Sequence, residues 1–206
     1  YQAVAHGADT VLFFQMRRSI GACEKYHGAL IDHAGHEHTR VFREMAALGQ
    51  ELKELGSQVM GSRIRAKAAI VVDWDNWWAL EYSAGPSCDL RYMDEVKRYY
   101  AAFDELNIPV DLISVEDDLG KYSLVAAPVL YMVKTGYERE LKRFVEDGGT
   151  LIATFFSGLV EEHDLVITGG YPGRLRDIFG VWVEEIDALP VGERNGFSWR
   201  GKQYPA

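Results

Sequence analysis

The hydrophobic residues of the first 60 positions follow two successive patterns. Residues 10–16, TVLFFQM, are a compact run of β-branched and aromatic side chains after a Gly-Ala-Asp turn, which predicts a buried strand. A polar, glycine-containing stretch follows over residues 17–38. With the helix predicted next, these segments would make one βα unit. In a barrel of such units, the loop at the carboxyl end of the strand carries the chemistry.

The helix is predicted from its apolar spacing and its ends. Thr39 is positioned to cap the first turn, and Gly56 is a plausible stop. Apolar side chains recur between them at helical spacing: Val41, Met45, Leu48 and Leu52.

From residue 68 onward, short apolar runs alternate with amphipathic stretches. The runs predict strands at residues 68–73, 108–115, 122–133, 150–156 and 181–186. The amphipathic stretches predict helices at residues 93–106, 137–146 and 172–179. This alternation predicts a doubly wound, open α/β sheet of about 140 residues.

Composition and charge narrow the class of protein. With 48% hydrophobic and 12% aromatic residues, the chain can form a packed core. Its formal net charge of −9, without a basic stripe, argues against a nucleic-acid partner. Two distant cysteines suit a reducing compartment, so a cytoplasmic protein is expected. No apolar run approaches the ~20 residues that span a bilayer, so no membrane partner is expected.

The two ends of the chain suggest a piece of a longer polypeptide. The sequence starts at Tyr1 inside a helical pattern, without an initiator methionine, and Gly7-Ala8-Asp9 would stop that helix. No charged region precedes a long apolar core, so this start does not predict a signal peptide.

Residues 20–40, IGACEKYHGALIDHAGHEHTR, hold four of the six histidines. A structural zinc site commonly combines C-x₂₋₄-C with H-x₃₋₅-H. Here His33, His36 and His38 are spaced by three and two residues, with Cys23 as the nearby thiol. The stretch has no further cysteine beside Cys23, and the sequence has no H-E-x-x-H helix. The spacing does not favour a metal site, and a zinc-binding regulator is kept as an alternative.

Glu24 and His27 are separated by three residues and would face the same way on one helical turn. A carboxylate beside an imidazole above a barrel strand can bind hydroxyl groups, because both offer acceptors and the imidazole also offers a donor. The alternative is a capping carboxylate and a solvated histidine. Spacing alone does not decide between them.

The first strand of the second unit ends in a D-x-D motif. Asp73 and Asp75 lie where open α/β sheets bind ligands, and such a pair can hold a metal. Trp74, Trp77 and Trp78 interleave them and suit a packed interface at least as well. We favour packing over metal binding here.

Three further motifs lack the context that their chemistry needs. Ser157 follows a strand, but Phe155 stands where the G-x-S-x-G elbow needs its first glycine. The glycines of GGYPG do not form G-x-G-x-x-G, so no dinucleotide is expected. Cys88 lies in a polar loop without an adjacent histidine, which argues against an amidotransferase.

Taken together, the motifs resemble glycoside hydrolase family 42, the multidomain β-galactosidases. HGADTVLFFQMRRSIGACEKYHGALIDHAG and TRVFRE look like the last strand and helix of that family's (β/α)₈ barrel. DWDNWWALE, PSCDLRY, YYAAFDELNIPVDLI, DDLGKYSLVAAPVLYMV, GGTLIATFFSGLVEEHDLV and GGYPGRLRDIFGVWVEE look like its trimerisation domain. That domain is similar to class I glutamine amidotransferases but lacks their cysteine. The resemblance implies a barrel end at residues 1–62 and a trimerisation domain at residues 63–206.

The resemblance also implies an activity and a division of roles. It implies hydrolysis of terminal β-D-galactosides with retention, by two glutamates about 5 Å apart that both lie upstream of Tyr1. Glu24 and His27 match positions that bind galactose hydroxyls in the −1 subsite. The family's zinc cysteines, where they exist, also lie upstream. No metal or cofactor is therefore expected in this chain, and the segment alone should be inactive.

Two positions depart from the family pattern, and one alternative function stays open. Cys23 stands where an aromatic or apolar residue usually precedes the glutamate, and Met16 stands where tryptophan is common. Both departures affect the surface expected to stack on the sugar. The expected assembly is a homotrimer. The alternative is a non-catalytic assembly module whose interface would use Trp74, Trp77 and Trp78.

Overall fold

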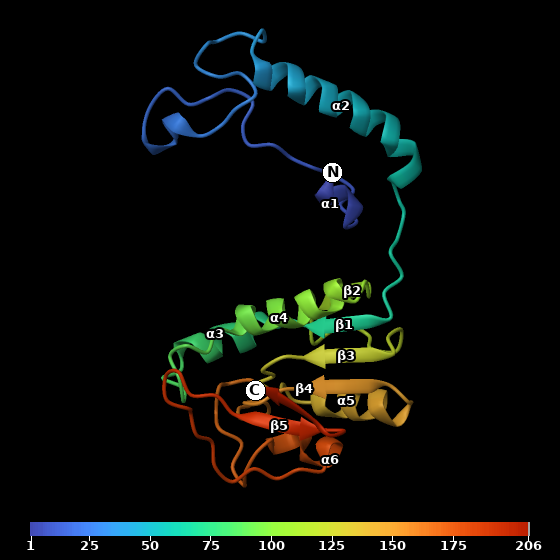
Figure 1. Cartoon of the computed structure of the whole chain (residues 1–206), viewed down its shortest axis with the longest axis vertical. Helices are drawn as coiled ribbons and strands as arrows, with labels where there is room; N and C mark the ends of the chain where they lie inside the picture. Colours follow the sequence, from blue (N-terminus) through green and yellow to red (C-terminus); the bar gives the residue numbers. More distant parts are fainter. Residues whose placement is uncertain (206) are drawn as a thin grey trace. The chain divides into compact units, whose positions relative to one another are not determined.

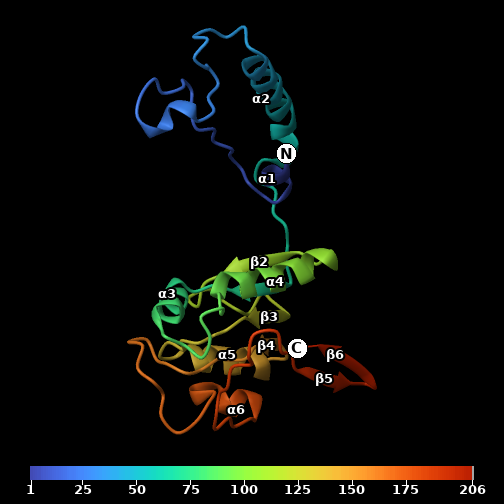
Figure 2. The same cartoon turned by 60° about the vertical axis from the view of Figure 1, so that its left-hand side comes forward.

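The computed structural model describes residues 1–205, which form two compact units, Tyr1–Ile64 and the residues from Arg65 onward. Figures 1 and 2 show the elements of each unit from two sides. None of the helices in the described residues is both long enough and apolar enough to cross a lipid bilayer.

The first unit contains two short helical turns, α1 (Gln2–Ala5) and η1 (Cys23–Tyr26), and one long helix, α2 (Arg40–Val59). The predicted cap of α2 is confirmed, because the Thr39 hydroxyl oxygen accepts a hydrogen bond from the Phe42 N–H at 3.3 Å. The predicted stop at Gly56 is wrong, since the helix runs on to Val59. The left-handed backbone that ends helices is taken by Gly61 instead, with φ of 75°.

The strand predicted at residues 10–16 is not formed. Backbone pairing starts only at its end, where the Ile31 N–H donates to the Met16 carbonyl at 2.8 Å. Upstream, Leu12 and Phe14 are 89% and 69% exposed. An extended segment becomes a strand when neighbouring strands satisfy its N–H and C=O groups. The described residues offer no such neighbour to residues 10–14, so their apolar pattern has nothing to pair with.

The second unit is built on four parallel strands. They are β1 (Ala68–Val71), β2 (Val110–Ile113), β3 (Leu124–Ala127) and β4 (Thr150–Ala153), in the order β2-β1-β3-β4. In register, Ile70 of β1 lies opposite Leu112 of β2 and Ala126 of β3. The chain runs from β1 to β2 on one side and from β3 to β4 on the other side. The carboxyl ends of β1 and β3 therefore form a topological switch point. The predicted parallel sheet is confirmed.

Helices cover both faces of this sheet, which makes it doubly wound. On one face, α3 (Trp74–Tyr82) and α4 (Tyr92–Glu105) pack against Ile70 and Ala126. On the other face, α5 (Tyr137–Glu146) packs with the 3₁₀ turn η2 (Gly173–Leu175), and α6 (Arg176–Phe179) follows that turn. α5 has the bounds that the sequence predicts. Two apolar cores result, one on each side of the sheet.

Several elements of the second unit differ from the prediction, including α3, which was not predicted, and β4, which ends at Ala153 and not at residue 156. β3 ends at Ala127 and not at residue 133, because Pro128 has no N–H to donate and Val129 takes φ of 44°. The prediction of a strand at residues 181–186 is wrong. Only Val183 forms a bridge, with Tyr171, and the residues around it have no ladder partner among those described. A hairpin of β5 (Gly196–Trp199) and β6 (Lys202–Pro205), in dark red in Figure 2, was not predicted.

Candidate functional site

The predicted sugar-binding residues lie on one exposed turn of the first unit. Glu24 lies in η1, and His27 is the first residue after η1. The His27 N–H donates to the Glu24 carbonyl at 3.0 Å, so the turn is closed by its own backbone. Both side chains are exposed to solvent, and the rings of His27 and Phe14 form a T-shaped pair with centroids 6.4 Å apart. The structure therefore places a carboxylate, an imidazole and an aromatic ring on the same short stretch.

The sequence analysis missed the residue that holds this turn. The guanidinium of Arg18 donates to the carbonyl oxygens of His27 at 2.7 Å and Tyr26 at 2.8 Å. Its third hydrogen bond goes to the Asp32 carboxylate at 2.6 Å. One planar cation therefore ties both ends of the loop together. Arginine suits this role because its donors are fixed in a rigid fork.

Asp32 is stabilised as a carboxylate by two neighbours. The His33 N–H donates to it at 2.6 Å, and this bond, with the Arg18 guanidinium beside it, holds the pKa of Asp32 below its ordinary value. The charge of Arg18 is thus matched over the whole physiological pH range.

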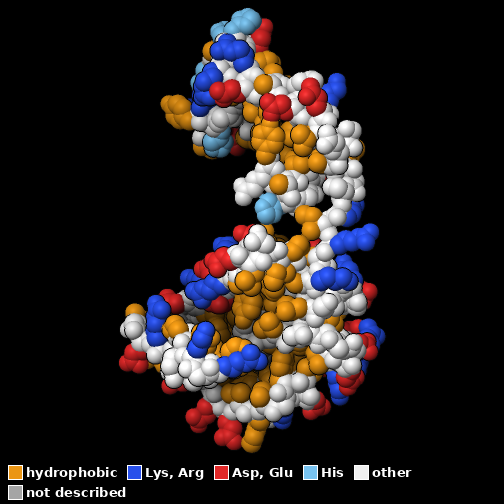
Figure 3. All heavy atoms as spheres, turned by 45° about the vertical axis from the view of Figure 1, so that its right-hand side comes forward, with side chains coloured by type: hydrophobic (Ala, Val, Ile, Leu, Met, Phe, Trp, Pro, Cys, Tyr) orange, Lys and Arg blue, Asp and Glu red, His pale blue; other side chains and the backbone are white. Residues whose placement is uncertain are grey.

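The other histidines of this stretch do not converge on one point. His33 Nε2 lies 2.8 Å from the Ser19 carbonyl, which binds the ring to the loop backbone. His36 and His38 have ring centroids 5.5 Å apart, and His36 Nδ1 accepts from the His38 N–H at 3.2 Å. Histidine side chains lie on the surface of this unit (pale blue in Figure 3).

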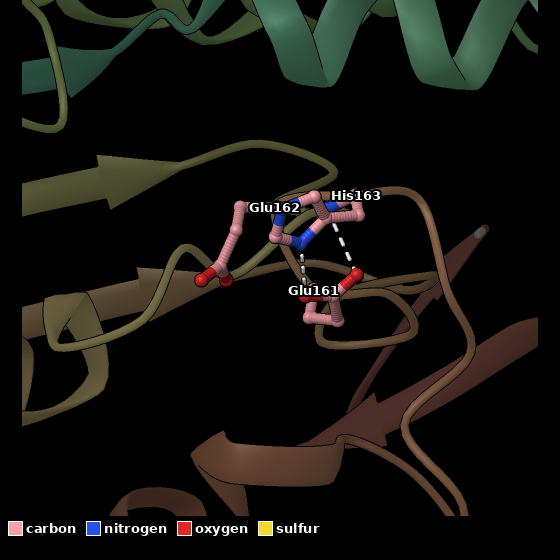
Figure 4. Close-up of side chains that lie close together, drawn as sticks. All are labelled: Glu161, Glu162 and His163. Carbon is pink, nitrogen blue, oxygen red and sulfur yellow. Dashed lines mark hydrogen bonds and ion pairs between the residues drawn. The ribbon is translucent and has the colours of Figure 1, made fainter.

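In the described chain, three metal-ligand side chains come within 4.8 Å of one another only at Glu161, Glu162 and His163 (Figure 4). His163 Nδ1 pairs with Glu161 at 2.9 Å. The Glu162 carboxylate accepts hydrogen bonds from the Thr135 hydroxyl at 2.9 Å and from the Thr135 backbone N–H at 3.0 Å. The Thr135 hydroxyl, with Arg174 nearby, lowers the pKa of Glu162 to about 2. Both carboxylates are already bound, Glu161 by His163 of the same loop and Glu162 by Thr135 of the turn before α5.

The predicted interface tryptophans form an exposed aromatic cluster on α3. Trp74 and Trp78 are 60% and 55% exposed. The ring of Trp74 stacks on Trp77 with centroids 5.2 Å apart and lies 6.1 Å from Trp78. Trp77 is partly buried, and its Nε1 has no hydrogen-bond partner in the described residues. We call Trp74, Trp77 and Trp78 the tryptophan cluster.

The D-x-D motif serves to fix this cluster. Lys134 Nζ, from the turn after β3, donates to Asp73 at 2.9 Å and to Asp75 at 2.6 Å. Asp73 is 7% exposed, so its charge needs this partner. Desolvation alone would lower the pKa of Lys134, but the hydrogen bonds to Asp75 and Asp73 outweigh it and raise that pKa. An ammonium therefore stands where the alternative hypothesis put a metal.

A buried amide makes the second connection between α3 and the turn after β3. Asn76 is fully buried, and its Nδ2 donates to the Val129 carbonyl at 3.0 Å. Its Oδ1 accepts from the Met132 N–H at 2.7 Å. Both ends of the amide are used, so Asn76 replaces the backbone partners that this turn lacks.

Neither candidate nucleophile has an activating base. Ser157 is 6% exposed, and its hydroxyl oxygen accepts from the Leu130 N–H at 3.1 Å, so it closes a turn. Cys88 is exposed in a loop, with Asp89 at 3.9 Å as its polar neighbour. A nucleophile of this kind needs an adjacent general base, and neither side chain is hydrogen-bonded to a histidine in the described residues.

The second unit also has a hollow that the sequence did not reveal. This apolar groove has a volume of about 790 Å³ and lies beside the end of β4. Its apolar walls include Leu90, Phe156, Tyr171, Phe179, Val183 and Ile186. Glu185, Asp187 and Asn195 add polar groups to its lining. Hydrophobic side chains also gather on one face of this unit in Figure 3.

Comparison with known families accounts for almost the whole chain. Residues 66–206 match the family model described as the beta-galactosidase trimerisation domain, and residues 1–55 match the model described as beta-galactosidase. The chain belongs to the glycoside hydrolase family 42 β-galactosidases. More narrowly, it corresponds to the C-terminal region of such proteins, with part of the glycosidase domain followed by the trimerisation domain.

Individual relatives agree with this assignment. Beta-galactosidase BgaA of Planococcus sp. (strain 'SOS Orange') is 58% identical over 203 residues, which are 98% of this chain and 30% of that protein. LacZ of Lactobacillus acidophilus is 49% identical over 99% of this chain and 31% of its own length. The crystal structure of beta-galactosidase from Bacillus circulans sp. alkalophilus matches with a TM-score of 0.94 at 58% identity, over all of this chain and 31% of that one. The chain spans about a third of the length of these relatives.

Proposed function

We propose that the protein to which this chain belongs hydrolyses terminal non-reducing β-D-galactose residues. The mechanism would be retaining, with one glutamate as acid/base and a second as nucleophile about 5 Å away. Both would lie outside residues 1–206. The identity of 49–58% to the beta-galactosidases of Planococcus and Lactobacillus supports this activity.

The observation that carries the proposal is the Arg18-clamped turn with Glu24 and His27 on it. In this proposal the Glu24 carboxylate accepts hydrogen bonds from galactose hydroxyls, and the His27 imidazole donates or accepts a further one. Phe14, against the His27 ring, would offer an apolar face to the sugar. Such contacts aid the rate when they strengthen in the transition state.

In the same proposal, residues 1–62 close the catalytic barrel and residues 63–206 form the trimerisation domain. The strand predicted at residues 10–16 would then form only beside the remaining strands of the barrel. The second unit would be an amidotransferase-like sheet without its nucleophile. The parallel order β2-β1-β3-β4 and the structural role of Ser157 support this view. Two exposed, unpaired cysteines are in keeping with a cytoplasmic protein.

The second candidate is an assembly module without a catalytic role of its own. The tryptophan cluster favours it, because exposed aromatic side chains that stack on one another are suited to an interface core. The proposed assembly is a homotrimer. In the longer protein this role and the hydrolase role are compatible, but for the isolated chain they predict different behaviour.

Substitution of Glu24 tests the hydrolase proposal. In the full-length protein, Glu24→Ala should lower kcat/KM for a chromogenic β-galactoside by about 1–3 kcal/mol, the cost of leaving a sugar hydroxyl unpaired. Glu37→Ala is the matched control, since Glu37 is an exposed carboxylate of the same loop whose ion-pair partner is His38. Equal kinetics for Glu24→Ala and wild type would remove Glu24 from the site.

The isolated chain separates the two candidates. It should show no turnover of the chromogenic β-galactoside, because both proposed catalytic glutamates are missing. Sedimentation of the isolated chain separates the candidates, because a trimer that does not bind sugar favours the assembly module. Turnover above the background rate would contradict the proposed placement of the catalytic glutamates.

A further inference from the structure

The chain has three asparagines, Asn76, Asn107 and Asn195, and only Asn195 precedes a glycine. Asn195 is exposed and lies directly before β5, on the lining of the apolar groove. Gly196 has no side chain to shield its own amide nitrogen from the Asn195 side chain. This dipeptide therefore differs from both other asparagines in the residue that follows, and from Asn76 also in its exposure.

The strand register predicts that the Gly196 amide makes no ladder hydrogen bond. Trp199 pairs with Lys202 across a two-residue turn, and Gly196 pairs with Pro205 three steps further along. Hydrogen-bonded and non-hydrogen-bonded pairs alternate in an antiparallel ladder. If the pair next to the turn is hydrogen-bonded, Gly196 and Pro205 form a non-hydrogen-bonded pair. This fits Pro205, which has no N–H to donate.

The amide that follows Asn107 is engaged. The Ile108 N–H donates to the Phe103 carbonyl at 2.9 Å at the end of α4. Ile108 is also β-branched, which crowds the approach to its nitrogen.

The side-chain amide of Asn76 is hydrogen-bonded through both its nitrogen and its oxygen. Asn76 uses its Nδ2 and Oδ1 in bonds to Val129 and Met132, and the next amide, Trp77 N–H, donates to the Asp73 carbonyl at 3.0 Å. Asn76 is also fully buried. Neither its side chain nor the nitrogen after it is free to react.

We propose that Asn195-Gly196 is a site of spontaneous deamidation in this protein. The deprotonated Gly196 nitrogen attacks Cγ of Asn195, the new C–N bond closes a five-membered succinimide, and the side-chain nitrogen leaves as ammonia. Solvent water then adds to one of the two ring carbonyls. The C–N bond that breaks decides the product, aspartate or isoaspartate. No oxidant or enzyme is needed.

The product changes the charge of the groove. At neutral pH either product is a carboxylate, so the net charge of the chain falls from −9 to −10. Glu185 and Asp187 already line the same groove. Deamidation thus gives the groove a third carboxylate. The isoaspartate product also adds a methylene to the backbone immediately before β5.

The full-length chain can be incubated at mildly alkaline pH and cleaved after glutamate. The fragment that begins at Arg194 then carries Asn195, residues 106–116 carry Asn107 and residues 55–81 carry Asn76. Mass spectrometry should find a gain of roughly 1 Da, with isoaspartate in the fragment, at Asn195 at least about tenfold faster than at Asn107 or Asn76. Asn195→Gln should abolish the change in the fragment that begins at Arg194, because glutamine would have to close a larger ring.

A urea-unfolded sample serves as the structural control. Unfolding should accelerate reaction at Asn107 and Asn76, whose following amides lose their hydrogen bonds, and should change the rate at Asn195 less than about threefold. Comparable rates at all three positions in the folded chain would overturn the proposal. The proposal would also be overturned if Asn195 stayed unmodified in the folded chain under conditions that deamidate it in urea.

Discussion

The Arg18 guanidinium and the Asp32 carboxylate lie 2.6 Å apart, and the same guanidinium binds the backbone carbonyls of Tyr26 and His27. The pair therefore does more than match two charges. It fixes the backbone on which Glu24 and His27 project. The geometry of the candidate sugar-binding turn depends on a residue that contacts neither of the two side chains.

Arg18→Ala should release this turn. In the full-length protein we expect kcat/KM for a β-galactoside to fall by about 1–2 kcal/mol, roughly 5–30-fold, because Glu24 and His27 lose their fixed position. Arg17→Ala is the matched control, since no hydrogen bond from its side chain is found in the described residues. Arg18→Lys should recover only part of the loss, because lysine has no rigid fork. Equal effects of Arg17→Ala and Arg18→Ala would argue against the clamp.

Glu162 predicts an acid-sensitive contribution to stability. Its pKa falls from 4.5 to about 2 in the folded protein, mainly through the Thr135 hydroxyl. A lowered folded-state pKa stabilises the folded form above pH 4.5, and this contribution is lost as pH falls from 4.5 toward 2. The difference in melting temperature between wild type and Glu162→Gln should be largest above about pH 5 and should narrow steadily as pH falls toward 2. A constant difference across this range would contradict the assignment.

Lys134→Met should destabilise the second unit. Without the ammonium, Asp73 keeps a buried charge with no partner, a cost of about 3–5 kcal/mol for fully buried pairs. Lys134 is partly exposed, so we expect about 1–3 kcal/mol by urea denaturation. Lys134→Arg keeps the charge and should lose less. The second substitution Asp73→Asn should recover much of the loss in Lys134→Met. An equal loss in the single and double variants would exclude coupling between the two residues.

The tryptophan cluster predicts where association is weakened. Trp74→Ala and Trp78→Ala should each weaken the proposed homotrimer by about 2 kcal/mol, roughly 30-fold in the dissociation constant, as at interface hot spots. Tyr82→Ala is the control on the same helix, because Tyr82 is 91% exposed and takes no part in the cluster's stacking contacts. Sedimentation velocity measures all three variants. If Tyr82→Ala weakens the trimer as much as the tryptophan variants, the cluster is not the interface core.

Local sequence patterns carried the prediction of much of the fold. Apolar runs located all four parallel strands, and amphipathic spacing together with the Thr39 cap located α2, α4 and α5. These features depend on residues close together in the chain. Helix α3 was missed because tryptophans cover several of its sides, so it has no clear polar face. The segment at residues 10–16 was mispredicted because a strand also needs partners, which an apolar run does not reveal.

The candidate site was predicted less completely for the same reason. Glu24, His27 and the tryptophans were identified from their residue types and neighbours in the sequence. The residues that hold them were not. Arg18 lies 14 positions from Asp32, and Lys134 lies 61 positions from Asp73. Nothing in the local pattern around Lys134 indicates that it faces the carboxylates at the start of α3. The metal hypothesis for Asp73 and Asp75 arose from that missing partner.

The two connections between α3 and the turn after β3 also impose an order on folding. Asn76 and Lys134 join segments more than 50 residues apart, and contacts this distant form late because a long loop must first close. α3 thus acquires its final position only after β3 has joined the sheet. A chain whose sheet is incomplete would not present its tryptophans in the stacked arrangement. Assembly through that surface would therefore select for subunits that have already finished folding.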